Sequence, residues 1–139
     1  MLMLKPAILA DVDILSRMNQ QLREDQGSQT AVTLEELEAR ARGWFAQGRQ
    51  ITIFAEAGEA LGYAVWADED GGVFLHAFFT ARHRRRTGLG RQALDLLLNG
   101  PWAGKAHVRL DVLLTNPRGH AFWQAMGFTD RAIAMERKL

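Results

Sequence analysis

The sequence has no cysteine among its 139 residues. This excludes disulfide bonds, thiolate metal sites and a cysteine nucleophile, and it fits a reducing compartment. No run approaches the roughly 20 apolar residues that cross a bilayer. The apolar opening MLML breaks at Lys5-Pro6, which is too short for a signal sequence. We therefore expect a cytoplasmic protein with no membrane partner and no metal site.

An excess of charge of either sign is also missing. The chain has 17 Lys and Arg against 16 Asp and Glu, a formal net charge of +1, so the total does not indicate nucleic-acid binding. The positive charge is nevertheless concentrated, because half of the segment Arg82–Arg91 is arginine. The length predicts a single domain, residues 1–139, with one proper core.

Hydrophobic periodicity predicts a mixed α/β (α+β) fold. Strands are expected at Met3–Leu9, Ile51–Ala57, Ala60–Asp68, Val73–Ala81, His107–Thr115 and Phe128–Leu139. Helices are expected from Asp11 or Asp13, from the capping box Thr33/Glu36, over Leu89–Leu98, and from Pro117 to Met126. A tight turn at Gly58-Glu59 would join two of the strands in a hairpin. This order favours a mixed, mostly antiparallel sheet with helices on both faces.

The stretch RRRTGLGRQAL (Arg84–Leu94) combines arginines and glycines ahead of a predicted helix. Gly88–Ala93 formally matches the dinucleotide fingerprint G-x-G-x-x-G/A, and Asp111 lies about 20 residues further on. In that fingerprint the first glycine follows a strand almost directly, whereas here the charged run Arg82–Thr87 intervenes. A Walker A loop is excluded as well, since no Gly-Lys-Ser/Thr is present.

The longer pattern is more specific. Arg85-x-x-Gly88-x-Gly90 resembles the R/Q-x-x-G-x-G/A acyl-CoA-binding motif of the GNAT family of N-acetyltransferases. Downstream, Asn116 and the segment Ala121–Phe128 resemble that family's N-x-x-A-x-x-F-Y-x-x-x-G-F region. The predicted order of elements is similar to the family's fold over nearly the whole chain. The resemblance implies a sheet that splays between its fourth and fifth strands.

The resemblance also implies the donor site. A glycine-containing loop that opens a helix presents unpaired N–H groups and the positive end of the helix dipole to a pyrophosphate. The residues implied to bind acetyl-CoA lie in this loop, on the preceding strand and after the next one: Phe79, Thr80, Arg85, Arg86, Thr87, Gly88, Leu89, Gly90, Arg91 and Asn116. Arg84 is a further candidate for a charge-assisted contact. Two other readings stay open, a solvated basic surface and an Asn116 that caps the following helix.

The catalytic groups are less clear from the residues. The family often has a tyrosine as general acid at the position of Trp123, and an indole N–H is a donor but not a usable acid. Trp123 is expected to pack in the core or to form a pocket wall. His76 is the candidate base; by strand alternation it would share a face with Phe74, Phe78 and Thr80. Tyr63, the only tyrosine, could be half-buried in a strand or face the acceptor site.

The resemblance implies a metal-free acyltransferase that transfers the acetyl group of acetyl-CoA to a primary amine of a small molecule or peptide. Homodimers are common among such domains, so a homodimer is one expected assembly. A GNAT-fold module that binds acyl-CoA with little catalysis is the alternative that Trp123 supports. A basic nucleic-acid-binding domain is a further alternative, but the aromatic residues Phe78 and Phe79 precede the arginine run instead of alternating with it.

Overall fold

The computed structural model describes residues 1–28, 30–84 and 87–139. A five-stranded sheet has the order β1-β2-β3-β4-β5, antiparallel except for the parallel pair β4–β5. The elements in chain order are β1 (Met3–Pro6), α1 (Val12–Asp25), α2 (Leu34–Ala46), β2 (Gln50–Glu56), β3 (Glu59–Glu69), β4 (Gly72–Thr80), α3 (Leu89–Asn99), β5 (Val108–Leu110) and α4 (Pro117–Ala125). Short 3₁₀ turns lie at Leu9–Asp11 and Arg82–Arg84.

Local sequence explains where these elements begin and turn. The Thr33 hydroxyl accepts a hydrogen bond from the Glu36 N–H at 3.1 Å, so Thr33 is the N-cap of α2, and the same hydroxyl donates to the Glu36 carboxylate at 3.1 Å. The β2–β3 hairpin turns at Ala57-Gly58, one residue earlier than predicted, with both residues at positive φ (52° and 81°). Two successive residues of positive φ match the right-handed twist of the flanking strands.

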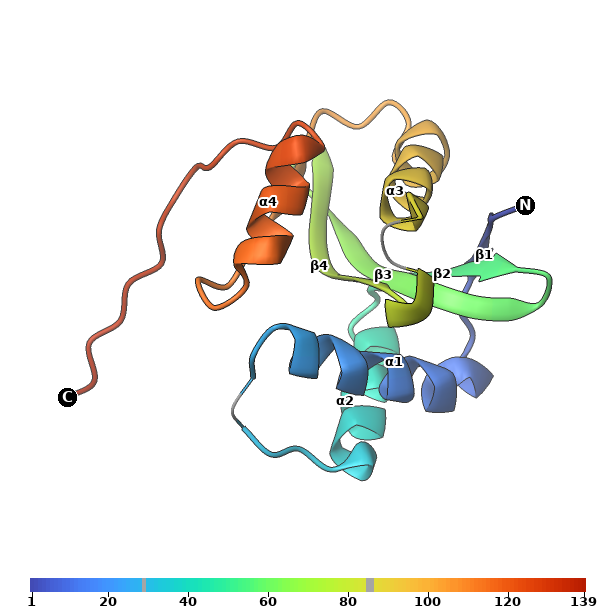
Figure 1. The fold of residues 1–139 in the computed structure, drawn as a ribbon, viewed down its shortest axis with the longest axis horizontal. Coiled ribbons are helices and arrows are strands. Elements are labelled where there is room, and N and C mark those ends of the chain that lie inside the picture. The colour runs from blue at the N-terminus through green and yellow to red at the C-terminus, as the bar shows by residue number, and fades with distance from the viewer. Residues whose placement is uncertain (29, 85–86) are drawn as a thin grey trace.

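Helices lie on both sides of the sheet (Figure 1), and an apolar cluster fills each side. On one face α1 and α2 cover Ile51, Ile53, Val65 and Phe79. On the other face the buried side chains of α3 pack against Phe54, Leu61, Val73 and Leu75, and Trp123 of α4 joins them. Helices therefore lie on both faces, as the sequence predicted.

Strand β4 contains a bulge at His76. Val65 of β3 pairs with Ala77 and the next residue, Trp66, pairs with Leu75, so His76 is an extra residue without a partner on β3. An extra residue reverses the alternation of side chains beyond it.

The bulge corrects one prediction about the faces of β4. Leu75 and Phe78 pack in the layer under α3, although simple alternation would separate them, and the Thr80 methyl group lies beside Gly90 of α3. His76 instead packs against the Phe74 ring, with 4.8 Å between centroids. The expectation that His76 shares a face with Phe74 is therefore confirmed, whereas the expectation that Phe78 and Thr80 lie on the same face is wrong, because alternation was counted through a bulge.

The last predicted strand is absent from the described residues. Beyond α4 the chain has no regular secondary structure up to Leu139, and every side chain from Thr129 onward is exposed. Figure 1 shows this segment leaving the end of α4 and running away from the sheet. Alternating apolar residues predict a strand, but a strand also needs a neighbour for its hydrogen bonds, and the segment has none here. No helix in the described part of the chain is long and apolar enough to cross a membrane.

Candidate active site

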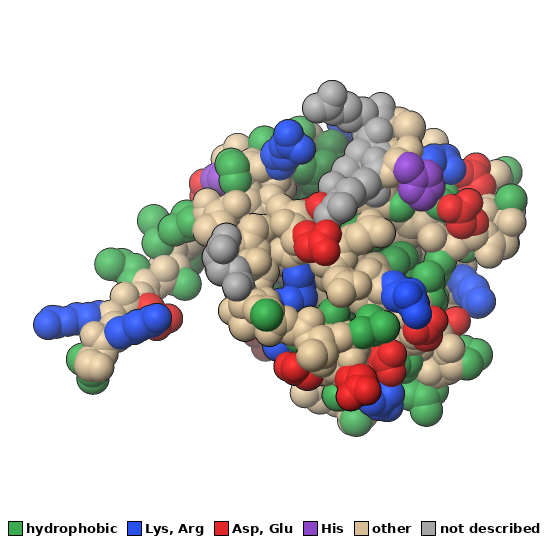
Figure 2. Space-filling view, turned by 60° about the horizontal axis from the view of Figure 1, so that its bottom comes forward, with side chains coloured by type: hydrophobic (Ala, Val, Ile, Leu, Met, Phe, Trp, Pro, Cys, Tyr) green, Lys and Arg blue, Asp and Glu red, His purple; other side chains and the backbone are tan. Residues whose placement is uncertain are grey.

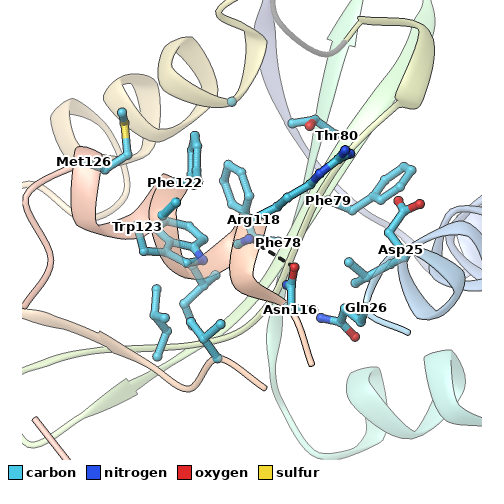
Figure 3. Close-up of a pocket in the computed structure, with 18 of the residues that line it drawn as sticks. Asp25, Gln26, Phe78, Phe79, Thr80, Asn116, Arg118, Phe122, Trp123 and Met126 are labelled. Atoms are coloured by element: carbon cyan, nitrogen blue, oxygen red, sulfur yellow. Dashed lines mark hydrogen bonds between the residues drawn. The ribbon is translucent and has the colours of Figure 1, made fainter. Parts of the chain in front are cut away.

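A cavity of about 720 Å³ opens where β4 and β5 separate. The two strands pair only at Val73–Val108, Phe74–Arg109 and Leu75–Leu110. Past this point the opening is bounded by the second half of β4, by Leu110–Leu113, and by the N-terminal ends of α3 and α4 (Figure 3). The predicted splay between the fourth and fifth strands is confirmed, and the bulge at His76 lies where it begins.

The bulge also decides which backbone groups of β4 face the cavity. The Val73 N–H donates to His107 C=O on the β5 side, whereas the Ala81 N–H donates to Leu61 C=O on the β3 side. Both residues are odd-numbered, so their N–H groups would point the same way without the extra residue. Alternation counted back from Ala81 directs the N–H groups of Phe78 and Thr80 toward the opening. By the same count the Phe79 N–H is directed toward β3.

The N-terminus of α3 has no side-chain cap. Gly88 occupies the N-cap position at φ +80°, a left-handed conformation that glycine adopts without strain. The first N–H groups of a helix have no partner within the helix, and here they lie at the cavity with Gly88, Gly90 and Arg91 among its lining. Leu89 turns its side chain into the core and is 2 % exposed. That this helix start binds an anion stays a prediction.

Gly90 has a packing role that the sequence did not suggest. A Cβ atom on this residue would lie 3.1 Å from the Phe122 ring of α4. The absent side chain therefore lets α3 approach α4 beside the cavity. Gly88 differs, because a Cβ there would meet nothing within 4 Å.

Not all the basic residues of the loop are directed at the cavity. Arg84 donates to the Glu56 carboxylate at 2.8 Å, and this bond, together with the amino terminus, lowers the pKa of Glu56. Arg84 therefore ties the loop to the end of β2. The Thr87 hydroxyl donates to the Arg84 C=O. Arg91 is exposed at the cavity, and the predicted donor residues Arg85 and Arg86 lie outside the described residues.

Asn116 and Arg118 place polar groups at the opposite wall. The Asn116 side-chain oxygen accepts a hydrogen bond from the Gly119 N–H at 3.0 Å, so this residue caps α4 and also lines the cavity. Figure 3 shows the Arg118 side chain extended across the cavity toward Thr80. Sequence reasoning missed Arg118; its position in the first turn of α4, two residues after Asn116, was the available signal.

The Trp123 side chain packs in the core and also forms part of the cavity wall. It is 9 % exposed, lines the cavity, and makes edge-to-face contacts with Phe78, Phe122 and Phe128 at centroid distances of 4.8–5.1 Å. Both readings made from the sequence therefore hold for the same side chain. Its indole ring shapes the apolar part of the cavity.

One imidazole and two carboxylates also line the cavity. His76 lines the cavity with Asp25 and Gln26 from the end of α1, and with Asp111 after β5. Partial burial and the positive charge of Arg49 lower the pKa of His76, against the opposing fields of Glu69 and Asp111. The imidazole is therefore neutral at neutral pH and able to accept a proton. Gln26 and Asp111 carried no clear signal as cavity residues in the sequence.

Tyr63 and His120 lie away from the cavity lining. Tyr63 is fully buried between Trp44 and Phe79, and burial raises the pKa of its hydroxyl, which has no hydrogen-bond partner among the described residues. His120 lies on the exposed side of α4 and bonds to Asp130 at 2.7 Å. Among the described residues there is no group of three potential metal-ligating side chains.

The fold and the splayed cavity define the class of protein, a mixed α/β protein whose sheet opens into a cavity between β4 and β5. A family model described as "Acetyltransferase (GNAT) family" matches residues 16–128, and the chain belongs to this family. A search of curated proteins found no match.

Solved structures agree on the fold. An acetyltransferase from Thermus thermophilus superposes with a TM-score of 0.79 at 24% identity, covering 92% of this chain and 86% of that one. An aminoglycoside N-acetyltransferase in complex with CoA gives 0.76 at 17% identity, covering 99% and 95%. A predicted acetyltransferase from Clostridium acetobutylicum with acetyl-CoA gives 0.74 at 16% identity, covering 99% and 96%.

Proposed function

We propose that the chain transfers the acetyl group of acetyl-CoA to a primary amine of a small molecule or peptide by direct attack of the amine. The observation that carries the proposal is the meeting, in one cavity, of an uncapped helix N-terminus with the separated edge of β4. Membership in the GNAT family and the CoA and acetyl-CoA complexes of two structural neighbours support the same donor.

The cavity suits each part of the donor. The N–H groups at the start of α3 and the side chain of Arg91 would bind the pyrophosphate, because a helix N-terminus attracts anions and Gly88 leaves it open. The pantetheine arm would lie along β4 as an additional strand, within reach of Asn116. The Phe78 or Thr80 N–H, which faces the opening, would polarise the thioester carbonyl.

On the acceptor side, the chain would supply a base and an orienting charge. His76 would take a proton from the incoming ammonium, directly or through water, because its lowered pKa keeps it neutral. Asp25, at the end of α1, would hold the cationic group near the opening. Trp123 would exclude water from the thiol end of the cofactor. Because an indole N–H is not a usable acid, the proton for the departing thiolate would come from water or from the amine.

The absence of cysteine makes the test direct. A thiol reagent added to the enzyme, acetyl-CoA and a panel of primary amines reports only released CoA, since the chain adds no thiol of its own. We expect amine-dependent release. In the His76→Gln variant we expect kcat/KM to fall and to lose its decline at acidic pH, with CoA affinity unchanged.

A binding module without catalysis is the second candidate, favoured by Trp123 in the wall where the family often has its acid. It predicts the same CoA affinity but no amine-dependent release with any acceptor. Failure of CoA to bind at all would contradict both functions.

A further inference from the structure

The sheet has an open surface next to the cavity, on the side of α1 and α2. Val73 and Leu75 of β4 pack in the cluster on the side of α3, so Phe74 between them points to the other side. His76 packs against the Phe74 ring and therefore lies on this side too. Phe74 is half-buried and belongs to neither of the two apolar clusters of the described residues, and His76 is exposed. Because His76 lines the cavity, this open surface begins at the cavity.

Two arginines lie at the ends of the row of residues that crosses the sheet at Phe74. Phe74 pairs with Ala67 of β3 on one side and with Arg109 of β5 on the other. Arg49 comes directly before β2 and, by the register of β2 with β3, is level with Ala67. Neighbouring strands are about 4.8 Å apart, so the Cα atoms of the two arginines are on the order of 14 Å apart. The positive charge of Arg49 acts on the His76 imidazole, so its side chain is directed over this surface. These five residues are here called the arginine shelf.

Both arginines of the shelf are half-buried, and neither makes a hydrogen bond or an ion pair with any described residue. The other half-buried arginines that the structure describes, Arg23 and Arg84, are both hydrogen-bonded. Figure 2 shows basic and acidic side chains interspersed over the surface that it faces, so the chain has anions available elsewhere. Partial removal of a guanidinium from water costs free energy that a bound anion offsets, and its fork of donors suits a carboxylate or a phosphate. The shelf therefore indicates a site for an anionic group.

Acidic groups lie at the two ends of the shelf. Asp111 lines the cavity, and Glu69 lies two residues beyond Ala67, toward the turn between β3 and β4. The negative charges of both carboxylates act on His76. Phe74 and His76 are two residues apart, so about 7 Å of strand separates the row of the arginines from the imidazole. An anion at the arginines and an ammonium group beside Asp111 would therefore be separated by the length of a small molecule.

We propose that the amine acceptor also carries an anionic group, a carboxylate or a phosphate, which Arg49 and Arg109 bind above the Phe74 ring while the amine lies at His76. This inference rests on the proposed acetyl transfer and narrows its acceptor to a small zwitterionic amine. Asp111 would hold the ammonium form. In the transfer, one ammonium proton goes to His76 and a second reaches the departing thiolate, while the nitrogen–carbon bond forms and the carbon–sulfur bond breaks.

The first test compares acceptors that differ in the anionic group. β-Alanine and γ-aminobutyrate are assayed against their neutral carboxamides, and phosphoethanolamine against ethanolamine, with released CoA as the readout. We expect kcat/KM to favour the anionic member of at least one pair by about 10-fold or more, and the pairs distinguish carboxylate from phosphate. In the double variant Arg49→Gln/Arg109→Gln this preference should disappear. The ratio within a pair is the readout, because the charge of Arg49 also acts on His76. A preference for the neutral member of every pair, or a preference that survives the double variant, would overturn the proposal.

Arg40→Gln is the matched control. It removes the same charge from an exposed arginine of α2 outside the cavity lining, and it should keep the preference of the wild type. The reverse change of charge, Arg109→Glu, should instead raise kcat/KM for ethylenediamine relative to β-alanine. An unchanged ratio of these two acceptors would contradict binding of the anion at Arg109.

A binding measurement separates this proposal from the proposed function. Calorimetric titration of β-alanine and of phosphoethanolamine into the CoA-saturated protein reports the affinity of the shelf without turnover. If no amine releases CoA, acetyl transfer fails, yet weaker binding of these probes to the double variant than to the wild type would support the anion site. No binding of either probe to the wild type would overturn it. Release of CoA by neutral amines alone would leave acetyl transfer standing and refute the anion site.

Discussion

Helices α2 and α3 begin in opposite ways. Thr33 closes the start of α2 with its own hydroxyl, whereas α3 begins at Gly88, which has no side chain to offer. Two of the four histidines differ in the same way, since His120 is hydrogen-bonded to Asp130 while His76 lines the cavity beside Phe74. In each pair, the group that is hydrogen-bonded within the protein contributes to stability, and the other group lies at the cavity. The comparison indicates that a polar group without a local hydrogen-bond partner marks a candidate binding site only where a cavity adjoins it.

The largest expected effect comes from adding charge at the open helix start. Gly88→Asp and Gly88→Asn have nearly the same shape, and both residues tolerate left-handed backbone better than most. We expect the aspartate variant to bind CoA about 10- to 100-fold more weakly than the asparagine variant, because its carboxylate repels the pyrophosphate at the same N–H groups. Calorimetric titration at low and high salt measures this difference, which should shrink as salt rises. Equal affinities would show that the start of α3 does not bind the phosphates.

Alanine substitutions at two helical glycines, Gly90 and Gly43, distinguish the effect of packing on stability from the effect of helix propensity. Gly90→Ala brings a Cβ to 3.1 Å from the Phe122 ring and should destabilise the fold by about 1 kcal/mol or more. Gly43→Ala, in α2 with nothing within 4 Å, should stabilise it by about 0.5–1 kcal/mol. Urea unfolding of both variants gives the two free energies. A stabilising Gly90→Ala would contradict the close approach of α3 to α4.

Removing the internal cap should affect only stability. Thr33→Ala deletes the hydroxyl that accepts from the Glu36 N–H, and we expect a loss of about 1 kcal/mol in the free energy of unfolding. CoA affinity should not change, because neither Thr33 nor any residue of α2 lines the cavity. A loss of CoA affinity as large as in Gly88→Asp would remove the contrast between the two helices.

The smallest effect concerns the pH dependence of stability. The pKa of His76 is lowered in the folded state from the ordinary 6.5, so the unfolded chain binds a proton first as the pH falls. Stability contributed by neutral His76 is therefore present above 6.5 and is lost as the pH falls from there toward the folded pKa. We expect His76→Gln to flatten the slope of unfolding free energy in this window. Urea titrations at several pH values measure it, and an unchanged slope would contradict the lowered pKa.

Much of the architecture followed from the sequence because local signals determine it. Periodicity located the helices, Thr33 and Glu36 marked the start of α2, and the glycine pattern placed the start of α3 at the cavity. The errors came from features without a local signal. The bulge at His76 depends on pairing with β3, and the segment after α4 has the pattern of a strand but no neighbouring strand among the described residues.

Contacts between residues that are distant in the sequence could not be predicted either. Arg84 belongs to an arginine run that suggested phosphate contacts, yet it bonds to Glu56, 28 residues earlier. Gly90 appeared to serve a ligand, but its missing Cβ also makes room for Phe122. Such contacts depend on how α3 packs on the sheet and on α4. No spacing of residues in a single sequence indicates them.

The short pairing of β4 with β5 has a consequence for the lifetime of the protein. Three residue pairs join these strands, and the second half of β4 lines the cavity. Any molecule that binds this edge only in the folded state stabilises it by about 2.7 kcal/mol at a concentration 100 times its Kd. Under the proposed function, resistance to unfolding and to proteolysis would therefore rise and fall with the supply of acetyl-CoA.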